Sequence, residues 1–256
     1  MIRASRLTSF LISLGVAALL ILLWHAVVQA GLVHRVFLPS PLKTAAALLA
    51  GLRDGPLLGA SLATLRRMFY GWFLACVAGI TLGALVGNSK TLKVYVAPML
   101  EALRPLPASA LIPLFIAVVG LSEGMILSVI AFGALWPLLL STIHGIASVE
   151  PVLYEVGNAL VMNKRDVLWK ISLPNAMPDI LAAMRLSLTI SLILAVVCEM
   201  LTGSEGLGQW LLNTSRAFAS AKMFAGVVIL GLMGYASNAL VNAVETRLLR
   251  WKPHRQ

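Results

Sequence analysis

The sequence predicts an all-α integral membrane protein with about six transmembrane helices, each formed by a run of roughly 20 mainly apolar residues. Hydrophobic residues make up 59% of the 256 residues, and charged residues make up only 12%. The charged share is about half of the roughly 25% that is typical of soluble domains. A soluble fold of this length could not bury so much apolar surface, so lipid is the expected solvent.

The candidate spans can be read directly from the apolar runs. Their approximate bounds are Phe10–Ala30, Met68–Val86, Ala97–Val119, Met125–Ile143, Leu186–Leu201 and Phe224–Val244. The first run has the outline of a signal peptide, because Arg3 and Arg6 precede it and small residues follow it. It is longer than the apolar part of such a peptide, and further spans follow. An uncleaved helix is therefore the favoured interpretation.

The net charge of +10 fits a membrane protein better than a nucleic-acid-binding protein. The basic residues lie mainly beside the apolar runs, where lipid headgroups and the positive-inside rule account for them. With an even number of spans and a cytoplasmic N-terminus, the larger share of lysines and arginines falls inside. Both termini, including a basic tail at 251–256, are then expected in the cytoplasm. Outside, Ser40 and Pro41 predict the start of a capped helix near the membrane surface.

Glycines recur every fourth residue in the second apolar run, at Gly79, Gly83 and Gly87. Such a stripe lets the backbones of two membrane helices approach closely, so we expect a packing contact there. The two cysteines, Cys76 and Cys198, lie inside apolar runs without a metal-ligand spacing. They are interpreted as small hydrophobic residues, with no disulfide and no metal site.

The third run contains Pro105, Pro107 and Pro113, which cannot all lie in one regular helix. Two interpretations stay open. The run is a kinked helix with a Glu101–Arg104 ion pair, or it is a broken helix beside a transport path. In the second case Arg104, Pro107 and Pro113 are candidates for lining the path.

Two further polar residues lie within apolar runs. Glu199 is close to the outer end of the fifth run, where it either lines or gates a path or extends to the membrane interface. Asn238, in a four-residue stripe with Gly234 and Asn242, needs a partner on another helix or a water-filled path. Both residues are therefore candidates for the translocation path.

The segment Glu155–Ile180 is charged and carries helix signals. Pro151 suits a helix start. A second helix can begin after Asn163 as N-cap, with Asp166 completing a capping box, and Pro174 is expected to end it. The result is a helical hairpin on the cytoplasmic face. Its apolar side is expected to rest on the helix bundle, and its charged side to face a partner.

This segment resembles the cytoplasmic loop of ABC importer permeases. That loop has the pattern E-A-A, three residues, G, nine residues, I, one residue, L-P, and Glu155, Ile171, Leu173 and Pro174 stand in register with it. The stretches "LRPLPASALIPLF" and "CEMLTGSEGLGQWL" look like the nitrate/sulfonate/taurine-type permeases in particular. The resemblance extends from about Leu38 to Trp251.

The resemblance implies a type I ABC importer permease fold with a cytoplasmic coupling-helix hairpin. It divides the chain into a first helix with a periplasmic segment (1–60), a permease core (61–250) with the coupling loop at about 150–182, and the basic tail. The implied partners are a cytoplasmic ABC ATPase dimer, a second permease chain, often as a homodimer, a periplasmic or lipid-anchored solute-binding protein, and membrane lipid. No cofactor is implied, and ATP is hydrolysed by the partner. The implied solute is a small anion such as a sulfonate, taurine or nitrate, and relatives also carry other molecules, including neutral or aromatic ones.

The resemblance also assigns residues to the ATPase-coupling loop. They are Glu155, Gly157, Val161, Asn163, Lys164, Arg165, Asp166, Ile171, Leu173 and Pro174. Two positions depart from the pattern, because Val156-Gly157 replaces Ala-Ala and Val161 replaces the glycine. That glycine suits a left-handed position, which a β-branched residue disfavours. Either the turn uses another geometry, with Asn163 left-handed, or the ATPase groove differs.

Two other classes of protein compete with this interpretation. An ion-gradient-driven secondary transporter usually has several polar groups near the midplane and internal repeats, and here only Glu199 stands out. A membrane enzyme would need a catalytic constellation. The histidines lie far apart, and neither G-x-S-x-G nor H-E-x-x-H occurs. The ABC permease interpretation is therefore preferred.

Overall fold

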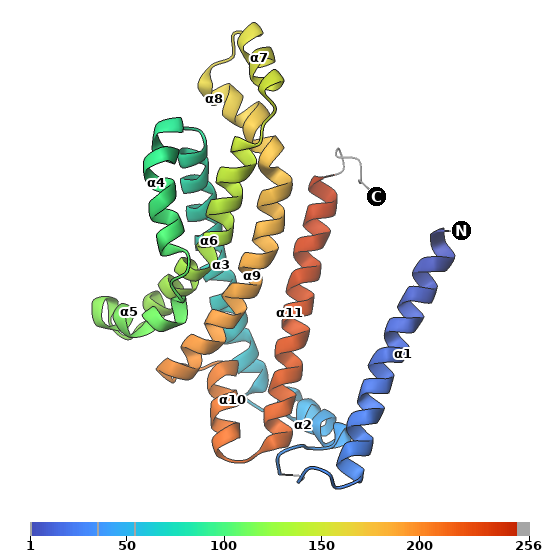
Figure 1. Ribbon diagram of the computed structural model, residues 1–256. Coiled ribbons are helices and arrows are strands. Elements are labelled where there is room, and N and C mark those ends of the chain that lie inside the picture. The colour runs from blue at the N-terminus through green and yellow to red at the C-terminus, as the bar shows by residue number, and fades with distance from the viewer. Residues whose placement is uncertain (1, 35, 54, 250–256) are drawn as a thin grey trace.

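The computed structural model describes residues 2–34, 36–53 and 55–249, and all regular structure in them is helical (Figure 1). Five helices are long and apolar enough to cross a membrane, and a bent pair makes a sixth if it counts as one span. In chain order the elements are α1 (Ile2–Gln29), α2 (Pro41–Arg53), α3 (Leu57–Gly87), α4 (Lys90–Leu103), η1 (Ala108–Leu111), α5 (Ile112–Val119), α6 (Glu123–Ala147), α7 (Pro151–Ala159), α8 (Lys164–Val167), η2 (Leu168–Ser172), α9 (Leu173–Thr202), α10 (Leu207–Arg216) and α11 (Ser220–Leu248). The predicted all-α fold with about six spans is confirmed. The predicted tail, 251–256, lies outside the described residues.

Helices α3, α6 and α9 form the centre of the bundle. The α3 glycines face α6 so closely that side chains would collide there. A Cβ on Gly79 would lie 2.7 Å from the Cβ of Leu138, and one on Gly83 would lie 2.6 Å from the Cβ of Thr142. A Cβ on Gly87 would lie 3.2 Å from the Cα of Ile143. The stripe therefore lies at a close helix–helix contact, as small residues allow in a membrane.

The largest differences from the predicted bounds are at the starts of two spans. Helix α3 begins at Leu57 rather than Met68, and α9 begins at Leu173 rather than Leu186. The part of α3 before Met68 includes Arg67, whose partners lie inside the fold, so this charge does not end the helix. Pro174 occupies the first turn of α9, directly after the π-helical turn η2 (Leu168–Ser172).

The third run is broken, as its prolines predict. Helix α4 ends at Leu103, and η1 with α5 follows at an angle of 81°. Pro105 and Pro107 lie in the break, and Pro113 is in the first turn of α5. No ion pair joins Glu101 to Arg104, both of which are described and exposed. The interpretation of this run as a kinked helix stabilised by that pair is therefore wrong.

Helix α1 stands away from the bundle and contacts it near one end (Figure 1). There Trp24 stacks on Phe224 of α11 with ring centroids 5.8 Å apart, and Val28 is buried. Most apolar side chains of α1 are exposed. Helix α2 follows, and the backbone N–H of Lys43 donates to the Ser40 hydroxyl over 3.3 Å, which bears out the predicted N-cap.

The α7–α8 hairpin projects from one end of the bundle (Figure 1). The first residues of α1 and the last turns of α11 point toward the same end. The turn between α9 and α10 lies at the opposite end. We call the two ends the hairpin end and the distal end.

Candidate functional site

The turn of the hairpin at the end of α7 is a Schellman motif. The N–H of Met162 donates to the carbonyl of Gly157 over 2.9 Å, and the N–H of Val161 donates to the carbonyl of Asn158 over 3.0 Å. Val161 has a φ of 51°, which is the left-handed conformation that this motif requires. The chain thus uses the same turn that a glycine would favour, and Val161 adopts it despite its β-branched side chain. The alternative of a left-handed Asn163 is wrong, because its φ is −70°.

Asn163 is the residue before α8, as predicted, but its side chain makes no capping hydrogen bond. The predicted capping box is therefore absent. Asp166 instead pairs with Lys170, one turn further along, with 2.9 Å between the carboxylate oxygen and the ammonium nitrogen. This is an ordinary exposed i,i+4 pair, which stabilises the helix by only about 0.2–0.5 kcal/mol.

Pro174 does not end the second helix, and this expectation is corrected. The chain runs from Lys164 to Thr202 as one helical span of 39 residues. A π-helical turn, η2, precedes the proline, and in it the N–H of Leu173 donates to the carbonyl of Leu168. Such a turn absorbs a residue that cannot fit the regular i→i−4 pattern. The hairpin is therefore continuous with α9.

The hairpin is held together at Gly157, which is buried. A Cβ there would lie 3.3 Å from Cδ1 of Ile171 and 3.5 Å from Cγ2 of Val167. The glycine that replaces the family alanine thus lies where α7 meets the second helix. Ile171, Leu173 and Pro174 are half-buried at the base of the hairpin.

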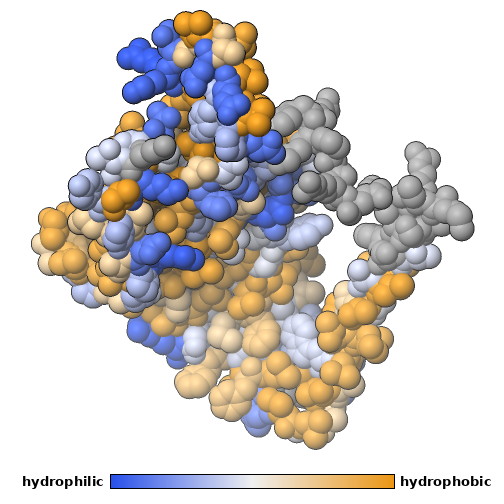
Figure 2. All heavy atoms as spheres, turned by 45° about the horizontal axis from the view of Figure 1, so that its top comes forward, coloured by the Kyte–Doolittle hydropathy of each residue, from blue (hydrophilic) through white to orange (hydrophobic). Residues whose placement is uncertain are grey.

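The exposed surface of the hairpin is mixed rather than only charged. Glu155, Lys164 and Arg165 are exposed. Large apolar side chains accompany them, with Trp169 68% and Val161 87% exposed. Blue and orange spheres lie side by side on the hairpin at the top of Figure 2. The expected apolar side of the second helix is half-buried, and Leu168 packs against the bundle. The exposed apolar side chains are additional to that side.

A cavity of about 800 Å³ lies against α4, η1, α6 and α9. Its polar lining comes from Arg104, Ser109, Ser141, His144 and Asp179. Trp136 also lines it and stacks edge to face on Phe132, with centroids 5.6 Å apart. The cavity is thus largely apolar, with a few convergent polar groups, as solute-binding cavities are.

Of the residues expected on the path, only Arg104 lines this cavity. Pro107 caps η1 just beside it, and Pro113 is exposed on α5. Asn238 lines a separate small pocket between α9 and α11. In the same stripe, Asn242 accepts a hydrogen bond of 3.1 Å from Arg185 of α9, so this amide has the interhelical partner that was expected.

Glu199 does not extend to the membrane interface, because it is fully buried. Its carboxylate accepts from the Thr64 hydroxyl over 2.9 Å and from the backbone N–H of Gly208 over 2.9 Å. Nη1 of Arg67 lies 3.0 Å from the same carboxylate. A buried carboxylate with this set of partners has its hydrogen-bonding capacity satisfied within the protein.

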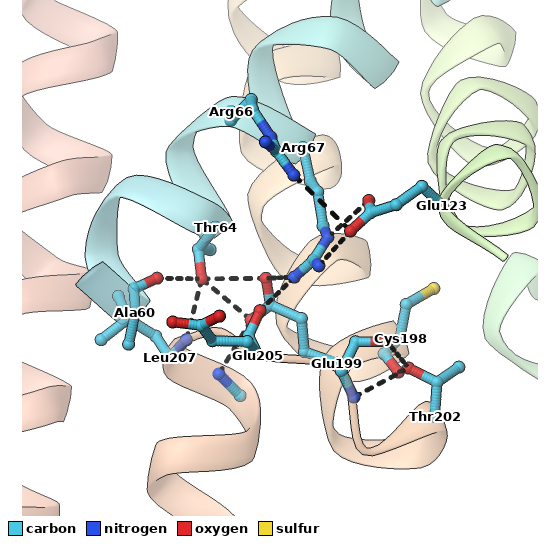
Figure 3. Close-up of polar contacts among 12 residues, drawn as sticks. Ala60, Thr64, Arg66, Arg67, Glu123, Cys198, Glu199, Thr202, Glu205 and Leu207 are labelled. Atoms are coloured by element: carbon cyan, nitrogen blue, oxygen red, sulfur yellow. Dashed lines mark hydrogen bonds and ion pairs between the residues drawn. The ribbon is translucent and has the colours of Figure 1, made fainter. Parts of the chain in front are cut away.

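Arg67 connects Glu199 to two other elements (Figure 3). Its Nε donates to Glu123 at the start of α6 over 2.9 Å, and its Nη2 pairs with the second oxygen of the same carboxylate. Nη1 also donates to the carbonyl of Glu205 in the α9–α10 turn. Arg67 is only 4% exposed. Through these contacts its single guanidinium joins α3, α6, α9 and that turn.

Sequence reasoning missed this cluster. Arg66 and Arg67 directly precede the predicted second span, Met68–Val86, and therefore lie outside it in the sequence-based topology. The available signal was a pair of opposite charges within apolar segments, Arg67 and Glu199, since such charges pair in membranes. Helix α10 and the cavity residues Trp136, His144 and Asp179 were also missed.

Comparison with known proteins shows the family to which this chain belongs. Residues 77–250 match the family model described as "Binding-protein-dependent transport system inner membrane component". The chain is 32% identical over 235 residues to the putative aliphatic sulfonates transport permease SsuC of Bacillus subtilis, covering 92% of this chain and 85% of that protein. It is 28% identical to the taurine transport permease TauC of Escherichia coli, covering 94% and 89%. It is also 28% identical to the nitrate import permease NrtB of Leptolyngbya laminosa, covering 73% and 67%.

Solved structures of similar fold agree with this result. The chain matches an inward-facing structure of the MetNI methionine ABC transporter with a TM-score of 0.64 and 20% identity, covering 76% of this chain and 95% of that one. An amino acid ABC transporter solved with histidines matches with a TM-score of 0.61 and 17% identity, covering 79% and 97%. At this identity the likeness shows a shared type I importer fold.

The chain therefore belongs to the family of binding-protein-dependent transport system inner membrane components. It is a multi-pass permease subunit of an ABC importer, and ATP hydrolysis belongs to another subunit. Membership implies an ATPase partner and a solute-binding protein. The family match thus confirms the resemblance seen in the sequence, and it removes the secondary transporter and the membrane enzyme as alternatives.

Proposed function

We propose that the α7–α8 hairpin, with Glu155, Asn163, Lys164, Arg165 and Asp166, docks in the ATPase subunit and transmits its movement to the membrane helices. The observation that carries the proposal is the continuity of the second hairpin helix with α9 over 39 residues. A force on the hairpin tip therefore acts directly on a helix that lines the cavity. The exposed tip supplies both charged and apolar groups, including Trp169, which interfaces favour.

The solute that fits this proposal is a small organic or inorganic anion of the sulfonate, taurine or nitrate type. The names of the similar permeases support this class. Arg104 lines the cavity and has no ion pair among the described residues, so it supplies a positive charge for an anion. Pro107 holds the start of η1 beside it.

The assembly that we propose is a homodimer of this chain. A single chain provides one hairpin and a cavity that is open along one side, whereas an ATPase dimer has a place for two hairpins. The large apolar side chains between Leu11 and Leu23 of α1 are exposed. They leave a helix surface for a partner chain or lipid. Mass measurement of the purified complex, with its lipid accounted for, tests the stoichiometry.

The orientation that we propose places the hairpin and both termini in the cytoplasm. The start of α1 and the end of α11 point toward the hairpin end (Figure 1). Since the ATPase is cytoplasmic, a docking hairpin fixes that end inside and the distal end outside. Fusion of a reporter at each terminus tests this orientation.

The direct test is capture of the ATPase subunit by wild type and by a Glu155→Lys variant. Charge reversal on the exposed hairpin is expected to abolish capture, because a like charge or an unpaired charge at an interface costs several kcal/mol. A Glu101→Lys variant is the matched control, since Glu101 is also exposed but lies on α4. Equal capture by both variants would contradict the docking role of the hairpin.

A further inference from the structure

The distal end of the bundle holds a charged cluster whose members come from different elements. Arg67 of α3 lies between Glu123 of α6 and Glu199 of α9, and it also holds the Glu205 carbonyl (Figure 3). Thr64, one turn before Arg67, accepts from the backbone N–H of Leu207 over 2.9 Å. The α9–α10 turn is therefore attached to α3 at two points.

The two carboxylates that share Arg67 differ in their access to water. Glu199 is completely buried, whereas the side chain of Glu123 is 51% exposed. Arg66 approaches the same Glu123 oxygen at 3.6 Å and is itself 58% exposed. The Arg67–Glu199 contact is thus shielded, while water or another ion can replace the Arg67–Glu123 contact. Arg67 therefore has one contact that is permanent and one that can be exchanged.

The α9–α10 turn fits against the cluster only because two of its residues are glycines without side chains. A Cβ on Gly206 would overlap the Glu199 carboxyl group, and one on Gly208 would overlap the carbonyl of Val196. Open pockets of about 420 and 540 Å³ lie on the two sides of the turn, and Glu205 lines both. Space therefore exists for the turn to move once its attachment is released.

Helix α9 connects this cluster to the hairpin. The helical span that begins at Lys164 in the hairpin reaches Glu199 within its last turns, before Thr202. Any axial shift or rotation that the hairpin receives therefore reaches the Arg67–Glu199 pair through one helix. A rigid element with charged partners at its far end is a physical route for coupling between two sites.

We propose that Arg67, Glu123 and Glu199 form a distal lock, a set of positioning residues that keep the α9–α10 turn closed against α3 and α6. Movement of α9 separates Arg67 from Glu123. It also breaks the two attachments of the turn to α3, at the Glu205 carbonyl and at the Leu207 N–H, so the turn opens while Arg67 stays with Glu199. The lock rests on the proposed coupling through the hairpin, and it adds the place where that movement is received. None of these three residues lines the large cavity, so their role is in positioning and not in contact with solute.

A natural reporter of the lock lies next to Glu199. Cys198 is completely buried, and the other cysteine, Cys76, is removed by Cys76→Ala. In the full chain in membranes, a Glu123→Gln variant is expected to raise the labelling rate of Cys198 by N-ethylmaleimide several-fold. Glu245→Gln is the matched control, because it breaks the Arg185–Glu245 pair between α9 and α11 away from the turn. Equal labelling in parent and Glu123→Gln would overturn the lock.

A second measurement uses the unaltered lock in the assembled transporter. Labelling of Cys198 is compared with and without MgATP and vanadate, which hold the ATPase closed. Several-fold faster labelling in the trapped state is expected, and an unchanged rate contradicts the release step. Capture of the ATPase is scored separately on the same samples. Unchanged capture by Glu155→Lys together with the expected Glu123→Gln effect would sink the hairpin proposal and leave the lock. Loss of capture by Glu155→Lys without a Glu123→Gln effect would do the reverse.

Discussion

The two ends of α9 use charged residues in opposite ways. At the hairpin end Lys164, Arg165 and Glu155 are exposed on a projecting element. At the distal end Arg67 and Glu199 are buried and bonded to several partners. Charges that need a partner from another protein must stay accessible, whereas charges that hold the fold must be satisfied within it. The difference supports the proposal that the hairpin is a contact surface, and it makes the distal cluster an internal attachment.

The energies of the two ends differ for the same reason. The Asp166–Lys170 pair is 41% and 68% exposed, and an exposed pair of this kind contributes about 0–1 kcal/mol. The Arg67–Glu199 pair is shielded from water, so removal of one partner leaves the other as an uncompensated charge. Substitutions at the distal end should therefore affect folding, and those at the hairpin should affect assembly.

The largest effect is expected from Arg67→Met. Because the buried Glu199 loses its counter-charge, the variant should lose about 3–5 kcal/mol of stability. Thermal unfolding of the purified chain, followed by size-exclusion chromatography, measures this loss. Lys170→Met is the matched control and should leave the midpoint nearly unchanged. Similar midpoints for both variants would contradict the division between the two ends.

A smaller effect is expected from Gly83→Leu, which tests the bundle between the two ends. A Cβ there already lies 2.9 Å from the carbonyl oxygen of Leu139. Forcing α3 and α6 apart should cost about 1–3 kcal/mol, as overpacking usually does. Gly231→Leu in α11 is the control, because nothing lies within 4 Å of its Cβ position. The same thermal measurement should show a loss only for Gly83→Leu.

Much of the fold could be predicted from the sequence because lipid imposes a simple rule on helix length and polarity. The glycine stripe of α3 and the proline break after Leu103 follow from sterics that act within a few residues. Helix bounds were less accurate where tertiary partners mattered. Arg67 does not end α3, because it finds Glu123 and Glu199 at sequence separations of 56 and 132 residues.

The site was predictable where its residues are neighbours in the sequence. The position of the hairpin, its first helix and its turn all follow from the segment around Glu155 and Asn163. The left-handed Val161 was not expected, because intrinsic preference disfavours it and the surrounding hydrogen bonds override that preference. The distal cluster could not be assembled from one sequence, since nothing local indicates which helices bring Arg67 and Glu199 together.

Trp169→Ala should weaken binding of the ATPase subunit without changing the stability of the isolated chain. Trp169 is 68% exposed, so its loss should leave the stability of the isolated chain unchanged. If the side chain is a central contact of the interface, affinity for the ATPase subunit should fall about tenfold or more, which corresponds to at least about 1.4 kcal/mol. Binding titration of the ATPase against both chains measures this change. Normal affinity would place Trp169 outside the interface.

The smallest effect concerns the turn of the hairpin. Val161→Gly should relieve the cost of a β-branched residue at a φ of 51°, which is about 1–2 kcal/mol before the greater freedom of glycine in the unfolded chain is subtracted. The hydrogen-bonded amides of residues 161 and 162 should then exchange more slowly with solvent, while transport is retained. Val156→Gly is the matched control, because that position is helical and glycine weakens helices by roughly 0.5–1 kcal/mol. Slower exchange in the first variant and faster exchange in the second would show that backbone conformation, rather than the exposed valine side chain, limits the stability of the hairpin.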